Sequence, residues 1–190
     1  LAQAGEGLTE SSAMPEYTPL VTPPERLTEP ALWFAFRKSE ILVLNGAGQP
    51  DLPVCVDLIA HGISPLRHVY LGLYDGRHCY AAEVHEAQEL PQGWAPLGLR
   101  DLFGMVETTL AALSGRAYQL LEWDRNHQYC SRCGSPNESR KEERSRVCPR
   151  CGFTSYPPVS PAIMILVTHG RKLLLARKPA VPQGRVSARA

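Results

Sequence analysis

Cys130-Ser-Arg-Cys133 and Cys148-Pro-Arg-Cys151 are the two stretches of sequence that decide the fold of this chain. Together they read C-x2-C-x14-C-x2-C, and each pair is followed by a glycine, Gly134 and Gly152, at which the backbone can turn with a positive φ. A pair of this kind presents two thiolates to one metal ion. Two pairs complete the tetrahedral four-sulfur shell that suits Zn²⁺.

Two other interpretations of the four cysteines are two disulfides or four unrelated thiols. The paired x2 spacing favours zinc, because it rarely arises without a metal. Four thiolates leave no open coordination position for water. The sequence therefore predicts a structural Zn²⁺ held by Cys130, Cys133, Cys148 and Cys151, and not a catalytic one.

Composition sets broader bounds on the chain. Its 190 residues suit one or two domains, and a hydrophobic content of 44% is ordinary for a globular protein. The net charge of +1 provides no field that attracts nucleic acid or membranes, and no apolar run approaches the roughly 20 residues that span a bilayer. The remaining cysteines, Cys55 and Cys79, lie among apolar neighbours and are predicted to be buried free thiols. With no visible signal peptide, we expect a cytoplasmic protein.

Upstream of the cysteines, the pattern changes from arm to sheet to helix. Residues 1–30 carry five prolines among polar residues, so we expect a mobile N-terminal arm. Short runs rich in β-forming residues follow at 31–36, 40–44, 54–59 and 67–74, and Asp75-Gly76 predicts a hairpin turn into 77–84. These runs predict a small, mostly antiparallel β domain that ends near Pro96.

From Leu99 to about His127 the apolar residues recur every three or four positions, which predicts an amphipathic helix. Gly104 and Gly115 lie within this stretch, where they are able to divide the helix into two pieces. The apolar stripe predicts a core or an interface, and it consists of Leu99, Leu102, Phe103, Val106, Leu110, Leu113, Ala117, Leu120 and Leu121.

Downstream of the cysteines, residues 156–161 predict a stiff proline-rich linker. It leads to a hairpin of two nearly continuous apolar strands, 162–168 and 172–177, around a His169-Gly170 turn. Such strands are usually covered on both faces, and a hairpin is not stable alone. The predicted class is α+β, with a β-rich domain ending in a helix at 31–127, a zinc ribbon at 128–157 and the start of an incomplete domain at 158–190.

This order of segments resembles the NADH pyrophosphatase branch of the Nudix hydrolases. The resemblance covers roughly residues 31–190 and is strongest from Leu99. The segments that carry it are Leu99-Arg-Asp-Leu-Phe-Gly104, Gly115-Arg-Ala-Tyr-Gln-Leu-Leu-Glu-Trp123, His127-x-Tyr-Cys-x-x-Cys-Gly134, Tyr156-Pro157-x-Val159-Ser160-Pro161 and Leu173-Leu-Leu-Ala-Arg177. It implies that the final hairpin is the first of a Nudix α/β/α sandwich.

The resemblance also implies an activity, cofactors and partners. The activity is hydrolysis of the pyrophosphate of NAD(H) to NMN(H) and AMP, with removal of NAD caps from RNA as a further reaction. Mg²⁺ or Mn²⁺ would bridge phosphate oxygens and activate a water. A homodimer is expected. The Nudix helix that carries the catalytic carboxylates, G-x5-E-x7-R-E-U-x-E-E-x-G-U, is not in this sequence. We therefore expect no catalytic residue within these 190 residues and no hydrolysis by them alone.

Three residues match substrate contacts of the family, each with a plainer alternative. The resemblance implies that Tyr156 stacks on the adenine across the dimer interface, although a tyrosine here also suits an anchor beside the ribbon. Arg100 matches an arginine near the substrate, or is a surface residue at a helix start. Glu143 matches a substrate-contacting glutamate, or is a surface charge. Ala190 aligns with the residue whose backbone carbonyl binds the catalytic metal, and Arg189 departs from the apolar residue usual beside it.

A competing hypothesis is a non-catalytic zinc-ribbon adaptor that binds nucleic acid or protein. The ribbon has a local excess of three positive charges, which favours a phosphate backbone. Three acids, Glu138, Glu142 and Glu143, oppose six cations, which are Arg132, Arg140, Lys141, Arg144, Arg146 and Arg150. The stretch from Glu138 to Arg144 imitates the Nudix helix only in composition, and it predicts a solvated ribbon loop.

Overall fold

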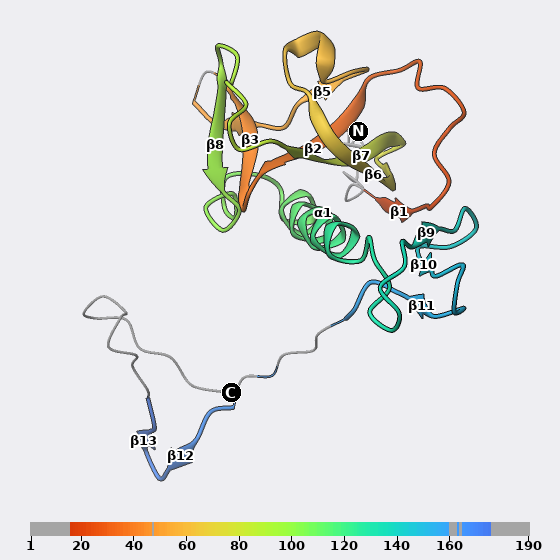
Figure 1. Cartoon of the computed structure of the whole chain (residues 1–190). Helices are drawn as coiled ribbons and strands as arrows, with labels where there is room; N and C mark the ends of the chain where they lie inside the picture. The colour runs from red at the N-terminus through yellow and green to blue at the C-terminus, as the bar shows by residue number, and fades with distance from the viewer. Residues whose placement is uncertain (1–15, 47, 160–162, 164, 176–190) are drawn as a thin grey trace, which may run out of the picture. The chain divides into compact units, whose positions relative to one another are not determined.

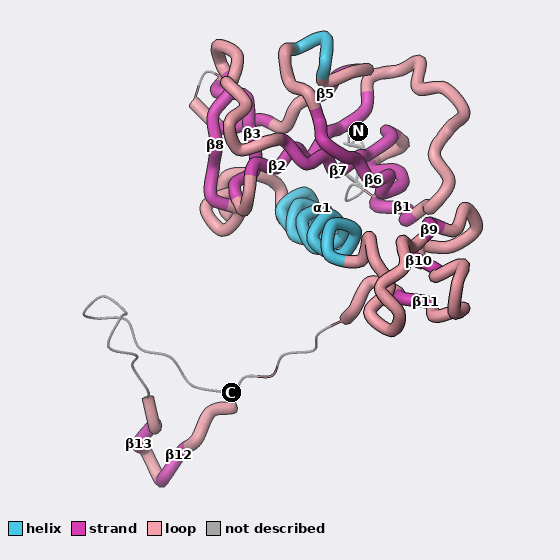
Figure 2. Tube along the Cα trace, viewed as in Figure 1, coloured by secondary structure: helices cyan, strands magenta, loops and turns pink. Residues whose placement is uncertain are grey.

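The computed structural model describes residues 16–46, 48–159, 163 and 165–175. The chain divides into two compact units, Leu1–Pro157 and Pro158–Ala190. The first unit contains one long helix and two sheets, so the predicted α+β class is confirmed (Figures 1 and 2).

A large sheet and one helix form the β domain, residues 17–126. The sheet runs in the order β1-β6-β7-β2-β3-β4, with β5 added beside β2 and β8 beside β3. Its pairs are antiparallel except for β2 and β7, so the prediction of a mostly antiparallel domain is confirmed. The strands are β1 Tyr17–Pro19, β2 Ala31–Arg37, β3 Glu40–Asn45, β4 Pro50–Asp51, β5 Val54–Cys55, β6 Pro65–Tyr74, β7 Arg77–Val84 and β8 Trp94–Gly98. A short 3₁₀ turn, Ile59–His61, precedes β6.

The β6–β7 hairpin turns where the sequence predicts. Asp75 has a φ of 50° and Gly76 a φ of 73°, which are the two positive values that a type I′ turn requires. An aspartate and a glycine accept these angles at little cost. The hairpin then places Tyr74 opposite Arg77.

Alternation along β2 gives the sheet two covered faces. Leu32, Phe34 and Phe36 belong to one apolar cluster. The residues that alternate with them, Ala31, Trp33 and Ala35, belong to another. The first cluster includes the buried side chains of the helix α1, Thr108–Asn126, which packs on β7, β2 and β6. Cys79 lies in the first cluster and Cys55 in the second, and both are buried free thiols, as predicted.

The helix α1, Thr108–Asn126, begins later than the sequence predicts. Gly104, with a φ of 88°, interrupts the expected helix, and residues 99–107 form turns. Glu107 then caps the helix by accepting from the backbone N–H groups of Thr109, at 2.9 Å, and Leu110, at 3.0 Å. The apolar stripe nonetheless contributes to the core, and its buried members are Leu102, Leu113, Ala117, Leu120 and Leu121.

Residues 1–30 were predicted to be a mobile arm, but residues 17–19 of this segment form the edge strand β1, which pairs with β6. The Tyr17 hydroxyl donates to the Leu71 carbonyl at 2.7 Å. Gly72, with a φ of 121°, allows the close approach, since a Cβ there would lie 2.1 Å from the Thr18 carbonyl oxygen. A long-range contact of this kind leaves no local sequence pattern. Residues 1–15 of the predicted arm lie outside the described residues.

The ribbon, residues 128–157, is a small antiparallel sheet of β9 Glu138–Ser139, β10 Arg146–Val147 and β11 Thr154–Ser155. Its buried residues are Cys130, Ser145 and Cys148. With almost no apolar core, the ribbon depends on another source of stability.

The second unit contains a hairpin of β12 Thr168–His169 and β13 Lys172–Leu173. The turn consists of Gly170, with a φ of 57°, and Arg171, so it begins one residue later than the predicted His169-Gly170 turn. Ile165, Leu166 and other apolar side chains of this unit are more than half exposed. Residues 160–162, 164 and 176–190, and with them most of the predicted strand ends, lie outside the described residues. No helix in the described part of the chain is long and apolar enough to cross a bilayer.

Candidate metal centre and nucleotide contacts

The two Cys-x-x-Cys segments fold into matching knuckles. The Gly134 N–H donates to the Cys130 carbonyl at 2.9 Å, and the Gly152 N–H donates to the Cys148 carbonyl at 2.9 Å. Both glycines have a φ of 72°, which a residue with a side chain rarely adopts. The same turn thus directs both pairs of sulfurs inward.

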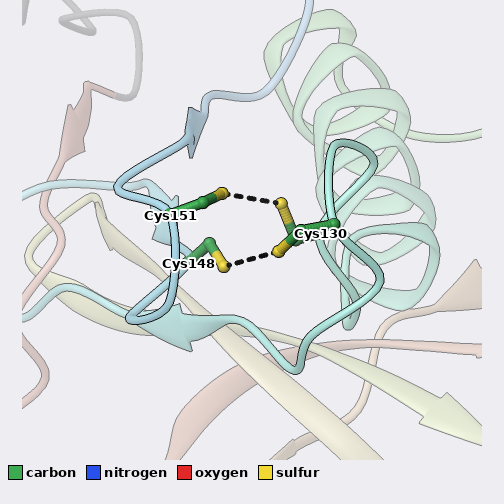
Figure 3. Close-up of side chains that lie close together, drawn as sticks. Cys130, Cys148 and Cys151 are labelled. Carbon is green, nitrogen blue, oxygen red and sulfur yellow. Dashed lines mark hydrogen bonds between the residues drawn. The ribbon is translucent and has the colours of Figure 1, made fainter.

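The four sulfurs converge on one point (Figure 3). They lie within 4.8 Å of one another, with 3.6 Å between Cys130 and Cys151 and 3.4 Å between Cys133 and Cys148. Four ligands at Zn–S distances of about 2.3 Å require sulfurs about 3.8 Å apart. The cluster therefore fits one tetrahedral Zn²⁺.

The disulfide alternative does not agree with this geometry. All six cysteines lie in the described part of the chain, and all six are free thiols. Both short sulfur separations greatly exceed a disulfide bond of about 2.05 Å. The paired spacing thus brings the thiols together as ligands of one site.

The electrostatics of the cluster also favour a cation. The backbone N–H and the hydroxyl of Ser135 lower the pKa of Cys133 to about 6. The Phe153 N–H lowers the pKa of Cys151, but burial and the neighbouring sulfurs outweigh it and raise that pKa to about 12. Four thiolates so close together repel one another, and a divalent cation removes that repulsion.

Tyr156 and Glu143, two of the three predicted substrate contacts, meet on the ribbon. The Tyr156 hydroxyl donates to Glu143 Oε1 at 3.3 Å, and its side chain is 55% exposed. Ser145 Oγ donates to the same carboxylate oxygen at 2.8 Å, and Arg140 Nη1 lies 2.9 Å from it. The Ser145 hydroxyl, followed by Arg140 and Tyr156, lowers the pKa of Glu143. The predicted solvated loop is therefore partly ordered around Glu143.

Among the described residues, the third predicted contact, Arg100, does not interact with Tyr156 or Glu143. It is exposed in the turn between β8 and α1. In the described structure, no hydrogen bond or ion pair joins it to Glu143 or Tyr156. Ala190 and Arg189 lie outside the described residues.

Two ribbon arginines hold the ribbon to the β domain, which sequence reasoning missed. Arg146 Nη2 lies 2.6 Å from the carboxylate of Asp124 near the end of α1, and both side chains are largely buried. Arg144 donates to the carbonyls of Tyr70 and Leu20, each at 2.9 Å. Charge counting along the ribbon assigns both arginines to solvent, because it carries no information about distant partners.

Comparison with known proteins gives the same two regions. Residues 30–123 match the NADH pyrophosphatase-like rudimentary NUDIX domain, and residues 125–156 match the NADH pyrophosphatase zinc ribbon domain.

Several curated relatives are each named NAD-capped RNA hydrolase NudC. The chain is 40% identical over 114 residues to the protein of Stutzerimonas stutzeri, an alignment that covers 60% of this chain and 41% of the relative. It is 35% identical over 153 residues to the protein of Deinococcus radiodurans, covering 78% and 51%. It is 37% identical over 135 residues to the protein of Pseudomonas fluorescens, covering 70% and 44%.

The chain thus spans about half the length of the curated relatives it matches. The two matched domains are adjacent, and they coincide with the sheet-and-helix core and with the four-cysteine ribbon. The chain therefore belongs to the NADH pyrophosphatase family of NUDIX proteins, of which it carries the rudimentary NUDIX domain and the zinc ribbon domain.

Proposed function

We propose that this protein hydrolyses the pyrophosphate bond of NAD(H), giving NMN(H) and AMP, and removes the NAD cap from RNA. The observation that carries the proposal is the Tyr156–Glu143 pair, which stands on the ribbon of an NADH pyrophosphatase family member. The name NAD-capped RNA hydrolase that its relatives carry supports the same substrate class.

The pair suits the adenosine end of a dinucleotide. An aromatic ring that is 55% exposed and tethered at its hydroxyl offers a flat face on which a base stacks. The proline after Tyr156 restricts its backbone and so limits the entropy lost on binding. Arg100 would serve a phosphate, since a guanidinium forms bidentate hydrogen bonds with phosphate oxygens.

Hydrolysis also requires Mg²⁺ or Mn²⁺ near the pyrophosphate. In the described residues, the single grouping of three or more metal-binding side chains is the four-cysteine cluster. That cluster has sulfur ligands only, whereas Mg²⁺ requires oxygen ligands. We therefore propose that residues outside the described part hold the catalytic metal and that the ribbon zinc is structural.

Localisation and assembly belong to the same proposal. We place the protein in the cytoplasm, where free thiols such as Cys55 and Cys79 remain reduced. We also propose a homodimer in which Tyr156 faces the nucleotide bound to the partner subunit. Light scattering on a version of the chain that extends through a Nudix domain tests this assembly, and a monomer would overturn it.

The competing adaptor function has less support from the ribbon's charges. Arg144 and Arg146 are engaged with the β domain, and Arg140 is paired with Glu143. A zinc ion with four thiolates also carries a net charge of about −2, which offsets most of the local excess of three. Little positive charge is then free to attract a phosphate backbone.

An activity assay tests the proposed function. The 190-residue chain is incubated with NADH and Mn²⁺, and AMP is measured. We expect no hydrolysis above buffer with metal, and we expect AMP release from a version of the chain that extends through a Nudix domain. Release by the 190 residues that disappears in Glu143→Gln would place the catalytic acid in the ribbon instead. An extended protein that leaves NADH intact would refute the proposal.

A further inference from the structure

Arg144 connects three segments that are far apart in the sequence. It lies in the loop between β9 and β10, and its Nη1 donates to the Tyr70 carbonyl in β6 at 2.9 Å. Its Nη2 donates to the Leu20 carbonyl, just after β1, at 2.9 Å. The loop makes one more contact with the same N-terminal segment, since Thr22 Oγ1 donates to the Lys141 carbonyl at 3.3 Å.

The surroundings of Arg144 hold its side chain in one defined position. No carboxylate forms an ion pair with Arg144 within the described ranges, and burial lowers its pKa. A cation removed from water is costly unless its hydrogen bonds are made. The planar fork of a guanidinium spans two carbonyls in a fixed geometry, whereas an ammonium is a single point charge. The side chain therefore joins β6, the end of β1 and the ribbon loop as one unit.

The two neighbours of Arg144 in the sequence, Glu143 and Ser145, connect it to Tyr156 through hydrogen bonds. Glu143 accepts from the Tyr156 hydroxyl at 3.3 Å. Ser145, which is 2% exposed, donates to the same carboxylate oxygen of Glu143 at 2.8 Å. A shift of the Arg144 backbone would therefore move the carboxylate that holds the ring of Tyr156.

We propose that Arg144 is a positioning residue, which fixes the Glu143–Tyr156 pair against the sheet of the rudimentary NUDIX domain. Arg146 and Asp124 hold the ribbon to α1 at a different point. The role of the pair in nucleotide binding rests on the proposed function. The anchoring of the loop and of the segment after β1 does not.

Binding of AMP tests the positioning role. AMP binding to the 190-residue chain is followed by ligand-observed NMR for wild type, Arg144→Ala and the matched control Arg150→Ala. Arg150 is exposed and, among the described residues, has no hydrogen-bond or ion-pair partner. We expect Arg144→Ala to weaken AMP binding roughly 2- to 30-fold, the range for coupling through an intermediate residue. Arg150→Ala should bind AMP as wild type does.

A double-mutant cycle separates positioning from general damage. In a Tyr156→Ala background, Arg144→Ala should cause no further loss of AMP binding, because the residue through which it acts is absent. Arg144→Lys should recover part of the affinity, since one ammonium reaches only one of the two carbonyls. An equal loss in both backgrounds, or wild-type affinity in Arg144→Ala, would overturn the proposal.

Amide hydrogen exchange tests the anchoring independently of any nucleotide. The Leu20 N–H donates to the Leu71 carbonyl at 3.3 Å, so its exchange reports on the segment after β1. In Arg144→Ala, exchange should accelerate in residues 16–22 and 140–145, while the zinc content and the core strands β2 and β7 stay unchanged. Unchanged exchange in both segments would refute the anchoring. If wild type fails to bind AMP, the proposed nucleotide contact is wrong, and the exchange result alone decides the role of Arg144.

Discussion

The rudimentary NUDIX domain and the zinc ribbon, although adjacent in the sequence, are stabilised by different means. The domain buries aromatic and aliphatic side chains on both faces of β2, with Phe34 fully buried at its centre. The ribbon has three strands of two residues each, and two of its three buried residues are cysteines. Metal ligation in the ribbon thus takes the place that the hydrophobic effect has in the domain.

The largest expected effect separates the two regions directly. Removing zinc with a chelator, or replacing Cys148 with Ser, should unfold the ribbon and loosen Tyr156, because structural zinc contributes about 10–16 kcal/mol in small zinc domains. The core strands β2 and β7 should remain folded. Elemental analysis for one zinc per chain, together with hydrogen exchange of both regions, checks this. A ribbon that stays protected without metal would break the comparison.

The converse change removes a large side chain from the domain. Phe34→Ala should lower the free energy of unfolding of the rudimentary NUDIX domain by about 3–5 kcal/mol, through lost burial and the cavity left behind. The zinc site lies outside this cluster, so zinc should remain bound until the ribbon itself unfolds. Urea denaturation followed by tryptophan fluorescence measures the first quantity, and a colorimetric zinc-release assay measures the second. Zinc loss in step with the domain would show that the two regions unfold as one.

The third effect concerns the junction between the regions. Asp124 and Arg146 are 15% and 11% exposed, so Asp124→Ala leaves an unpaired arginine between α1 and the ribbon. We expect a loss of about 2–4 kcal/mol in the free energy of unfolding, because breaking a largely buried ion pair strands a charge. Replacing Glu86, which pairs with Lys38 at the surface, should change stability little and is the matched control. Equal effects of the two replacements would mean that the junction pair is no more important than a surface pair.

Sequence reasoning succeeded where the determinant is local. The Cys-x-x-Cys pairs with their glycines, and the Asp75-Gly76 turn, contain within a few residues the chemistry that fixes their geometry. It failed where the determinant is a distant partner. The pairing of β1 depends on the missing Cβ of Gly72, and the role of Arg144 depends on carbonyls that lie 74 and 124 positions away along the chain.

The helix start is an intermediate case that the sequence could have revealed. The apolar stripe runs without a gap from Leu99, so periodicity alone extends the helix too far. Gly104 was a visible signal for a later start, because glycine is unfavourable inside a helix. Glu107, which caps the helix in the structure, is not one of the residue types that usually take this position, so the cap itself was not visible in the sequence.

That cap provides the smallest of the expected effects, and it acts on the domain alone. The Thr109 N–H and then the Tyr74 hydroxyl lower the pKa of Glu107 to about 2 from an ordinary value of 4.5. A carboxyl whose pKa is lower in the folded state stabilises the fold above its unfolded pKa, and this contribution is lost as the pH falls through the folded value. Glu107→Gln should therefore reduce stability at pH 7, and its difference from wild type should shrink between about pH 5 and pH 2.

Urea denaturation of wild type and Glu107→Gln at pH 7, 5 and 3 measures this difference. Acid also protonates the thiolates and releases zinc, but that change affects both proteins equally and cancels in the difference between them. Tyr74→Phe removes one hydrogen-bond donor to Glu107, the Tyr74 hydroxyl at 2.9 Å. Its difference in unfolding free energy from wild type should shrink with falling pH in the same way, but should be smaller at pH 7. A difference that stays constant from pH 7 to pH 3 would show that the charge of Glu107 does not stabilise the helix. The cap would then act through its shape alone, and acid sensitivity would belong only to the ribbon.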